Sequence, residues 1–514
     1  MSGWSHGYNV STGYTFGFYR ELAPDWLDLA LAMRGLETPR SDGSQPFRYL
    51  ELGSGQGFGL CLLAAANPEG EFLGIDFSPE HTAHARALAA DMGLANIRFV
   101  EGDFAVLGQS WPQDYGEFDY AVMHGIYSWV PEPVRQALVA ILTSAVRSGG
   151  AVYVSYNALP GWTSTLPFQH LLRSLEVREG LSGMKAIEAG RELFGKLEQA
   201  GSGVTKALPA LKARIEATHK QPAAYLVQEY LHENWHPMWC SKVMGELAQA
   251  KLDLAATANL AENLMPSVLP REFQQLLAGH DDPRLREDLT DCLINQTFRR
   301  DIFVRGPRRR FPAAADWQTT FHLWRLNTAE PPAAELPIAT AFGSVKLAAK
   351  AVAALLDALG DKPVSIAELA SGPAFSGKRH ALQQDLLLLA HAGWIGVGRR
   401  ADRSPEQATR CNTAVARLAG VGGPYRHLAA ARLGSAVGAG DSDLLLLDGY
   451  LEDPAAFGGK AEASLKTRLD RLGRKVAKDG VALSGDEEAE HIKRLAATFT
   501  ERTLPLWREL GVVA

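Results

Sequence analysis

The first part of the chain alternates short apolar runs with segments of helical periodicity. The runs that are apolar enough to form buried strands lie at 47–52, 71–76, 97–100, 119–123 and 151–156. Helix-period segments lie between them, at 59–67, 81–92 and 133–146. Strand and helix alternating at this spacing predict an α/β fold with a mainly parallel sheet and helices on both faces.

The periodicity changes after Trp162, where strand patterns give way to helical ones. We therefore take 47–164 as the strand-rich domain and expect a largely α-helical region at 165–305. A proline-rich connector at 306–337 then leads into a C-terminal domain at 338–514.

The C-terminal domain is predicted to begin with a winged-helix-like unit and to continue as helices. The helices of that unit and the apolar run after them are expected at 345–359, 366–369, 380–392 and 393–397. Basic residues at 308–310, 378–380 and 399–400 raise the possibility of DNA binding. The leucines at 386–389, however, predict a buried third helix, which favours a protein contact or a homodimer over nucleic acid. A glycine-rich linker is expected at 434–440.

Composition places the chain among ordinary globular proteins. Hydrophobic residues make up 46% and charged residues 21%, and 58 acidic against 52 basic residues give a net charge of −6. Such a balance disfavours non-specific binding to nucleic acid or anionic membranes. No apolar run approaches the ~20 residues that cross a bilayer, and the N-terminus lacks a secretory pattern. With only four cysteines, we expect a cytoplasmic protein without membrane insertion.

A glycine-rich turn follows the first predicted strand. Gly53, Gly55 and Gly57 let the chain turn tightly into a helix and let a ligand lie against bare backbone. A dinucleotide fingerprint would need its third glycine one residue later. Glu51, just before the turn, would repel a pyrophosphate but suits a cationic sulfonium and an amino group.

Two further acids follow the next two strands. Asp76 ends the second strand, where a carboxylate can accept hydrogen bonds from both hydroxyls of a ribose. Asp103 follows the third strand and can accept from an adenine amino group, while Phe77 or Phe104 packs on the ring. These pieces stand in order at the carboxyl ends of consecutive strands, where ligands of open α/β sheets bind.

On these residues the chain resembles class I S-adenosylmethionine-dependent methyltransferases with a Rossmann-like core. The longer chain is similar to the subgroup that adds a methyltransferase regulatory domain, which includes rickettsial-type protein-lysine methyltransferases of outer-membrane proteins. The supporting segments are 118–130, 155–162, 228–231 and 298–300. The resemblance implies S-adenosyl-L-methionine as the cofactor and a protein lysine as the acceptor.

Residues after the fourth strand are candidates for the chemistry. His124 is expected beside the cofactor, where it would act as a general base, hydrogen-bond the cofactor or hold the loop. Tyr127 and Trp129 would form an aromatic wall around an incoming amine, or else pack in the core.

The aromatic N-terminal segment, 1–46, is expected to fold over the cofactor as a lid that excludes water. Tyr14 is the first candidate for an active-site tyrosine and Tyr8 the second, whereas Phe16 and Phe18 fit better as packing residues.

No metal site is expected. His232, His236 and Cys240 have the spacing of one helix face, but Pro237 breaks that face and no fourth ligand is near.

The sequence therefore predicts an S-adenosylmethionine-dependent methyltransferase that modifies protein lysines. Two alternatives stay open. One is an O- or N-methyltransferase of a glycan, lipid-linked sugar or small metabolite, which as a hydroxyl methyltransferase would depend on His124 as its base. The other is a non-catalytic S-adenosylmethionine-binding regulator.

Overall fold

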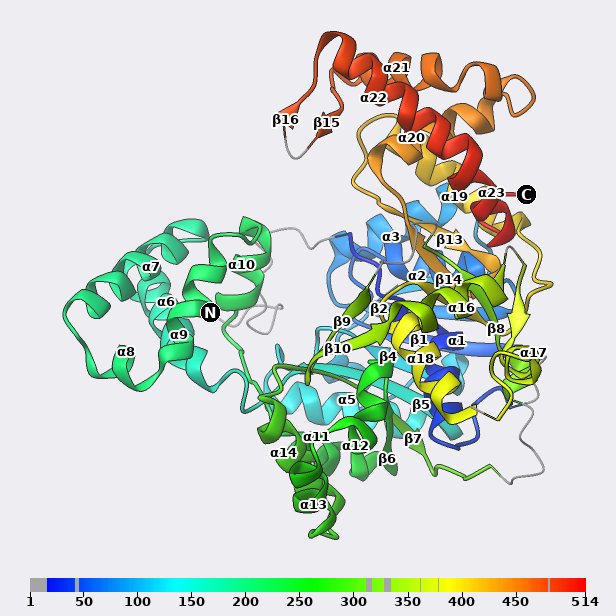
Figure 1. The fold of residues 1–514 in the computed structure, drawn as a ribbon. Coiled ribbons are helices and arrows are strands. Elements are labelled where there is room, and N and C mark those ends of the chain that lie inside the picture. The colour runs from blue at the N-terminus through cyan, green and yellow to red at the C-terminus, as the bar shows by residue number, and fades with distance from the viewer. Residues whose placement is uncertain are drawn as a thin grey trace.

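The protein, in a computed structural model, is built around one large mixed sheet from which two other parts extend (Figure 1). The structure describes residues 16–41, 46–310, 317–327, 334–360, 362–377, 379–478 and 481–514. A helical arm projects to one side of the sheet, and the C-terminal helices stand above it in this view (Figure 1).

The central sheet has seven strands in the order β3-β2-β1-β4-β5-β7-β6. Its strands are β1 (Phe47–Leu52), β2 (Gly70–Asp76), β3 (Ile97–Glu101), β4 (Phe118–Met123), β5 (Val146–Asn157), β6 (Leu252–Thr257) and β7 (Phe298–Arg305). The first five run parallel, and β7 lies antiparallel to both of its neighbours. The predicted α/β fold and the positions of its first five strands are confirmed, β5 being longer than expected.

Helices cover both faces of this sheet. One face packs against α1 (Pro24–Met33), α2 (Phe58–Ala66) and α3 (Pro79–Asp91), and the other packs against α5 (Glu132–Ala145) and α11 (Cys240–Leu247). The buried leucine and alanine side chains of these helices form the core, as their apolar periodicity predicts.

The region predicted to be largely helical is so, but it also supplies β6 and β7. Strand β7 is not predicted from the sequence because its first half, Phe-Arg-Arg-Asp, is mostly charged and leaves an apolar run of only three residues, Ile302–Val304. Arg299 and Asp301 are nevertheless buried, with 7% and 1% of their surface exposed, because they pair with each other. Buried charges that pair with one another interrupt the apolar pattern of an interior strand, so hydrophobicity alone does not predict that strand.

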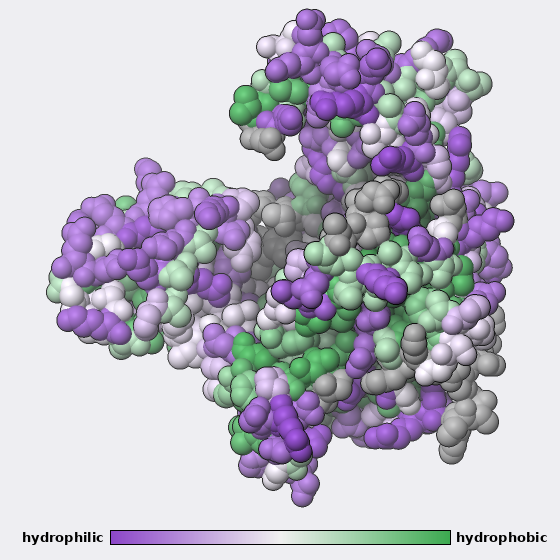
Figure 2. Space-filling model, viewed as in Figure 1, coloured by the Kyte–Doolittle hydropathy of each residue, from purple (hydrophilic) through white to green (hydrophobic). Residues whose placement is uncertain are grey.

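The arm consists of α6 (Leu166–Glu179), α7 (Met184–Gln199), α8 (Gly203–Ala207), α9 (Pro209–Thr218) and α10 (Ala223–Tyr230). It has its own small core, which includes Phe168, Leu172 and Phe194. Its visible outer face is mostly hydrophilic, and a notch separates it from the C-terminal helices (Figure 2). After the arm come α12 (Met265–Val268), α13 (Arg271–Ala278) and α14 (Pro283–Ile294).

The winged-helix-like unit has the expected order of elements with two corrections. Its helices are α16 (Ala349–Leu359), α17 (Ile366–Ser371) and α18 (Arg379–His391), with β11 (Val364–Ser365) and β12 (Ile395–Gly398) between and after them. Residues 345–348, predicted to be helical, instead belong to β10 (Gly343–Ala348), which pairs with β9 (Glu335–Thr340). The predicted connector contains β8 (His322–Arg325), the middle strand of the sheet β11-β8-β12. Leu386–Leu389 are buried, as predicted.

The rest of the C-terminal domain is mainly helical. Its helices are α19 (Glu406–Ala419), α20 (Asp441–Glu452), α21 (Ala461–Arg471), α22 (Gly485–Thr498) and α23 (Leu504–Glu509). The glycine-rich segment expected as a linker forms β14 (Ser435–Gly438), paired with β13 (His427–Ala430). Among the helices of the described ranges, none is both long and apolar enough to span a bilayer.

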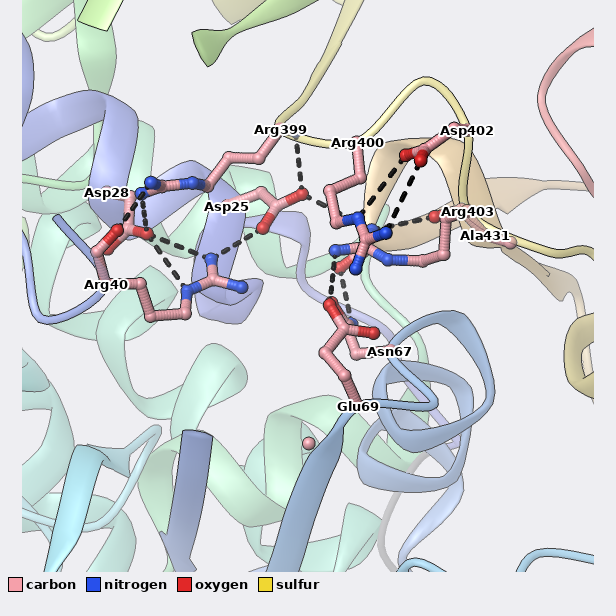
Figure 3. Close-up of polar contacts among 12 residues, drawn as sticks. Asp25, Asp28, Arg40, Asn67, Glu69, Arg399, Arg400, Asp402, Arg403 and Ala431 are labelled. Carbon is pink, nitrogen blue, oxygen red and sulfur yellow. Dashed lines mark hydrogen bonds and ion pairs between the residues drawn. The ribbon is translucent and has the colours of Figure 1, made fainter. Parts of the chain in front are cut away.

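A buried network of charges joins the C-terminal domain to α1 and to Glu69, just before β2 (Figure 3). Asp25 and Asp28 on α1 are fully buried. Arg399 donates from its backbone N–H to Asp25 at 3.0 Å and from Nη1 to Asp28 at 2.6 Å. Arg403 Nη2 donates to Glu69 at 2.7 Å. Arg399, a candidate DNA contact in the sequence, is therefore buried and paired with acids of α1, where it cannot contact DNA.

Candidate active site

The glycine-rich turn between β1 and α2 requires glycine for two reasons. Gly53, Gly55 and Gly57 have φ values of +79°, +52° and +78°, in the left-handed region that favours glycine. At Gly57 the neighbouring atoms also leave no room for a side chain, because a Cβ there would lie 2.5 Å from Ala85 Cβ. The predicted tight turn is confirmed.

Asp76 holds the turn from the end of β2. Its Oδ2 accepts from the Gly55 N–H at 2.8 Å and its Oδ1 from the Ser78 N–H at 2.9 Å. Asp103, at the end of β3, caps the short helix α4 (Phe104–Leu107) by accepting from the Ala105 N–H at 2.8 Å. Both carboxylates are thus fixed at the carboxyl ends of parallel strands.

These residues line a hollow that we call the strand-end cavity. It is bounded by Gly53, Gly55, Asp76, Phe77, His81, Asp103, Phe104, His124, Gly125, Ile126, Trp129, Val130 and Val134. Most of the residues predicted to bind the cofactor are therefore brought together here. The position matches the general ligand site of open α/β sheets, beyond the carboxyl ends of the strands.

A second hollow, the N-terminal cavity, lies on the other side of the glycine turn. It shares Gly53, Gly55 and His124 with the strand-end cavity and is also lined by residues 16–19, Leu22, Glu51, Gln56, Gly57, Phe58, Gly59, Leu60 and Leu63, with Ser54. Glu51 and Gly57, the remaining predicted cofactor residues, belong to it. Burial, reinforced by the nearby carboxylate of Asp76, raises the pKa of Glu51 to about 8. A cationic ligand group placed beside this carboxyl would favour its ionised form.

Residues 16–19 and Leu22 of the N-terminal segment line this cavity, whereas α1 of the same segment packs in the core and forms no lid. The ring of Tyr19 packs at a tilt against the ring of His124, with centroids 3.9 Å apart. Phe16 packs edge-on against Tyr425 at 5.2 Å, in contact with the C-terminal domain. Tyr8 and Tyr14, the lid candidates, lie outside the described residues, so their role stays a prediction.

His124 lies where the cavities meet. Its Nδ1 lies 3.0 Å from the Tyr153 hydroxyl and 3.2 Å from Ser155 Oγ. Burial, together with the positive charge of Arg300, lowers the pKa of His124 to about 3. The imidazole is therefore neutral at pH 7 and a weak base, which fits a positioning role better than proton abstraction from a hydroxyl.

A third hollow, the arm cavity, lies between the sheet and the arm and has a volume of about 380 Å³. It shares Tyr19 with the N-terminal cavity, Gly125 and Trp129 with the strand-end cavity, and His124 with both. Its other walls are Asn157, Trp162, Arg214, Tyr225, Gln228, Glu229, His232, Thr297, Phe298 and Arg300. Residues from the arm and from β7 thus face the end of the sheet where the residues predicted to bind the cofactor gather.

Polar and aromatic contacts organise this cavity. The guanidinium of Arg214 lies 3.9 Å from the centroid of the Trp162 ring, and that of Arg300 lies 5.0 Å from the Phe298 ring. Asn157 Nδ2 donates to Glu229 Oε1 at 3.0 Å. Burial raises the pKa of Glu229 to about 7, against the opposing effects of that hydrogen bond and of Arg214.

The two aromatic candidates after β4 have different places. Trp129 lines both the strand-end cavity and the arm cavity. Tyr127 is fully buried, and its hydroxyl donates to Glu246 at 2.6 Å. Of the two interpretations left open, the cavity wall applies to Trp129 and core packing to Tyr127, so the placement of Tyr127 in an acceptor wall is corrected.

The histidines with metal-like spacing do not share a helix. His232 and His236 lie in the irregular segment between α10 and α11. Within the described part of the chain, no group of three or more His, Cys, Asp or Glu residues is arranged to hold a metal ion.

Comparison with known proteins identifies the family. Residues 50–150 match the family described as "Methyltransferase domain", and residues 222–305 match "Predicted methyltransferase regulatory domain". The uncharacterized protein sll1526 of Synechocystis is 30% identical over 522 residues, which cover 99% of each chain. The chain belongs to the class I methyltransferases that carry a methyltransferase regulatory domain.

Two other comparisons show further similar proteins. An uncharacterized protein of Rickettsia prowazekii is 26% identical over 54% of this methyltransferase and 48% of its own length. Among solved structures, PKMT2 of Rickettsia typhi in complex with AdoHcy has a TM-score of 0.70 at 16% identity, with 97% of this chain and 99% of that chain covered. The methyltransferase thus shares its whole fold, arm and C-terminal domain included, with that protein.

The cofactor of this methyltransferase is S-adenosylmethionine, and the two adjoining cavities suit it chemically. Glu51 offers a buried carboxyl for its cationic part, and the glycine turn leaves backbone exposed where a Cβ would intrude. The predicted roles of Asp76 toward the ribose and of Asp103 toward the adenine stay predictions.

The arm cavity contains functional candidates that the sequence analysis missed. Glu229 and Phe298–Arg300 had served only to recognise the regulatory segment, and Arg214 had not been singled out. The available signal was the sequence Gln-Glu-Tyr-Leu at 228–231, which places the one acid of a mainly apolar helix near its end. Nothing local indicated that this helix faces the end of the sheet.

Proposed function

We propose that this methyltransferase transfers the methyl group of S-adenosylmethionine to lysine side chains of a protein. The observation that carries the proposal is the arm cavity, which adjoins the cofactor cavities at His124 and Trp129 and is lined by aromatic rings and one carboxyl. An ammonium favours aromatic faces and carboxylates. The resemblance to rickettsial-type protein-lysine methyltransferases supports the same acceptor.

The residues of the cavity would act mainly by orientation and by excluding water. S-adenosylmethionine supplies a methyl group bonded to a sulfonium, and a methyl transfer of this kind needs the acceptor nitrogen in line with the breaking bond. Trp129 would place the lysine stem beside His124 at the junction of the cavities. Removal of the amine from water lowers its pKa and favours the neutral, nucleophilic form.

A hydroxyl acceptor, as in a glycan, is less well supported. A hydroxyl needs a base to remove its proton, and the candidate for that role was His124. Burial and the charge of Arg300 lower the pKa of His124 to about 3, which makes this imidazole a poor proton acceptor.

The first experiment follows labelled methyl from S-adenosylmethionine into an extract of the source cell. Label released as small peptides by a protease, and as methyllysine after hydrolysis, is the expected result. Label that resists the protease or appears on a sugar or small molecule would contradict the lysine proposal.

A pair of tryptophan variants then connects the activity to the cavity. Trp129→Ala is expected to lower the rate of label transfer by at least about tenfold, because it removes a wall shared by the cofactor and acceptor cavities. Trp239→Ala is the matched control, since Trp239 is 36% exposed and lies outside these cavities. Equal rates of label transfer for the two variants would show that the arm cavity takes no part in the reaction.

A further inference from the structure

Glu229 is the one acid among the described residues that line the arm cavity. It lies on α10 in the arm, and Asn157, the last residue of β5, donates to its Oε1 at 3.0 Å. This hydrogen bond connects the arm to the end of the central sheet. The position of the Glu229 carboxyl is therefore set relative to the strand ends that carry the cofactor residues.

The other charged and titratable groups of the cavity wall are cationic or neutral at pH 7. Arg214 on α9 and Arg300 on β7 are cations. Burial, with the charge of Arg173, lowers the pKa of His232 to about 4, so that histidine is neutral at pH 7. Burial raises the pKa of Tyr225 above its usual range. Only Glu229 can carry negative charge here near neutral pH.

The ionisation of Glu229 suits an exchange of protons with an amine. Burial raises its pKa to about 7, although the hydrogen bond from Asn157 and the charge of Arg214 oppose that rise. An ammonium beside the carboxyl would favour the ionised form, and the same carboxylate can then take up a proton near neutral pH. Without it, the two arginines would repel an ammonium from the cavity.

We propose that Glu229 selects the amine acceptor, because its carboxylate in the arm cavity binds the ammonium of the incoming lysine and accepts the proton that this ammonium must lose. The inference rests on the proposed function. In the balanced step, the amine nitrogen forms a bond to the methyl carbon, and the carbon–sulfur bond breaks with its electron pair left on sulfur. The proton released from the ammonium passes to Glu229 and then to water.

The first test measures binding and requires no turnover. The enzyme is saturated with S-adenosylhomocysteine, and two probes are titrated by calorimetry: Nα-acetyl-lysine N-methylamide and its neutral counterpart, Nα-acetyl-norleucine N-methylamide. Wild-type enzyme is expected to prefer the lysine probe by at least about tenfold. Glu229→Gln keeps the shape and a partner for Asn157 but is expected to lose this preference.

The matched control is Glu233→Gln, because Glu233 is an exposed acid close by in sequence that lies outside the cavity. It is expected to keep the preference of the wild type. Binding of S-adenosylhomocysteine by all three proteins checks that they are folded. A lysine preference that survives in Glu229→Gln, or that is absent from the wild type, would overturn the role of Glu229.

The second test is the pH profile of kcat/KM for label transfer into extract protein. The rate for wild type is expected to rise with pH through about 7 as Glu229 ionises. Glu229→Gln is expected to lose this pH-dependent rise and to react at least about tenfold more slowly at pH 8. Glu229→Asp is expected to recover part of the rise and part of the rate. Methyllysine formed with unchanged rate and profile by Glu229→Gln would overturn this inference and leave the proposed function standing. Labelled methyl found on groups other than lysine would overturn both this inference and the proposed function.

Discussion

At position 57 the backbone conformation and the packing both exclude a side chain. Gly57 has a φ of +78°, and a Cβ there would lie 2.5 Å from Ala85 Cβ and 2.8 Å from Phe99 Cζ. Gly93 has a similar φ of +65° but no atom within 4 Å of the added Cβ. The two glycines therefore separate the cost of the conformation from the cost of the contacts.

We expect Gly93→Ala to lower the free energy of unfolding by about 1–2 kcal/mol, the cost of a left-handed conformation. Gly57→Ala should cost about 1–3 kcal/mol more because it also overpacks the turn, and it should weaken S-adenosylmethionine binding. Denaturant unfolding and calorimetry with the cofactor measure these effects. Equal losses in the two variants would show that packing around the turn relaxes freely.

The neutral His124 predicts a pH effect on stability whose sign can be stated. Burial, with the charge of Arg300, lowers its pKa from 6.5 to about 3 in the folded chain. Between these pH values the unfolded chain binds the extra proton, so the contribution of His124 is complete above pH 6.5 and falls as the pH falls. The slope is about 1.4 kcal/mol per pH unit.

Unfolding of the wild type and of His124→Gln between pH 6.5 and 5.5 tests this effect. The variant should lose about 1 kcal/mol less over this interval. His219→Gln is the control, because His219 is exposed on the arm, and it should follow the wild type. If His124→Gln also follows the wild type, His124 titrates normally in the folded chain.

At the scale of the element, β7 depends on one buried arginine. Arg299 donates to Asp301 at 2.8 Å, to Asp291 at 2.6 Å and to Glu287 at 2.8 Å. These bonds fasten α14 to β7, the strand that also carries Phe298 into the arm cavity. Asp291 and Asp301 are almost fully buried, so water cannot replace Arg299 as their partner.

Arg299→Met is therefore expected to cost about 3–5 kcal/mol, because it leaves buried carboxyls without their cation. Amide exchange in β6 and β7 should become faster, and label transfer should fall with it. Arg308→Met is the control, since Arg308 is 74% exposed in its pair with Glu37 and an exposed pair contributes about 1 kcal/mol or less. Unchanged exchange in β7 would contradict this account.

At the scale of the whole molecule, the buried charge network makes the C-terminal domain part of the enzyme core (Figure 3). Burial alone would raise the pKa of Asp25, but the guanidinium groups of Arg403 and Arg40 lower it to about 2. Its contribution to stability is therefore present above pH 3.8 and is lost as the pH falls toward 2. Arg403 belongs to the C-terminal domain, so that domain keeps an acid of α1 ionised.

Arg403→Met is expected to destabilise the whole chain by about 3–5 kcal/mol and to make the C-terminal domain sensitive to protease. Arg400→Met, three residues earlier in the chain, is the matched control because Arg400 pairs with Asp402 on the surface. Thermal unfolding and limited proteolysis compare the two variants. Intact resistance to protease in Arg403→Met would mean that the domains hold together without the network.

The positions that could be predicted are those whose role is set by local sequence. The five parallel strands, the glycine turn and the acids at the strand ends follow from short patterns, because period and turn chemistry depend on neighbours in the chain. Glu51, Asp76 and Asp103 lie at the two adjoining cavities for that reason. Burial of Leu386–Leu389 followed in the same way.

By itself, then, the sequence determined the fold of the core, the family and the identity of the cofactor. Only the tertiary structure decided that β6 and β7 complete the sheet, that Tyr127 is buried while Trp129 lines a cavity, and that Glu229 faces the strand ends. The reason is that these outcomes depend on partners far away in the chain. A buried arginine pairs with its acids, and a helix of the arm meets the end of a strand, only after the chain has folded.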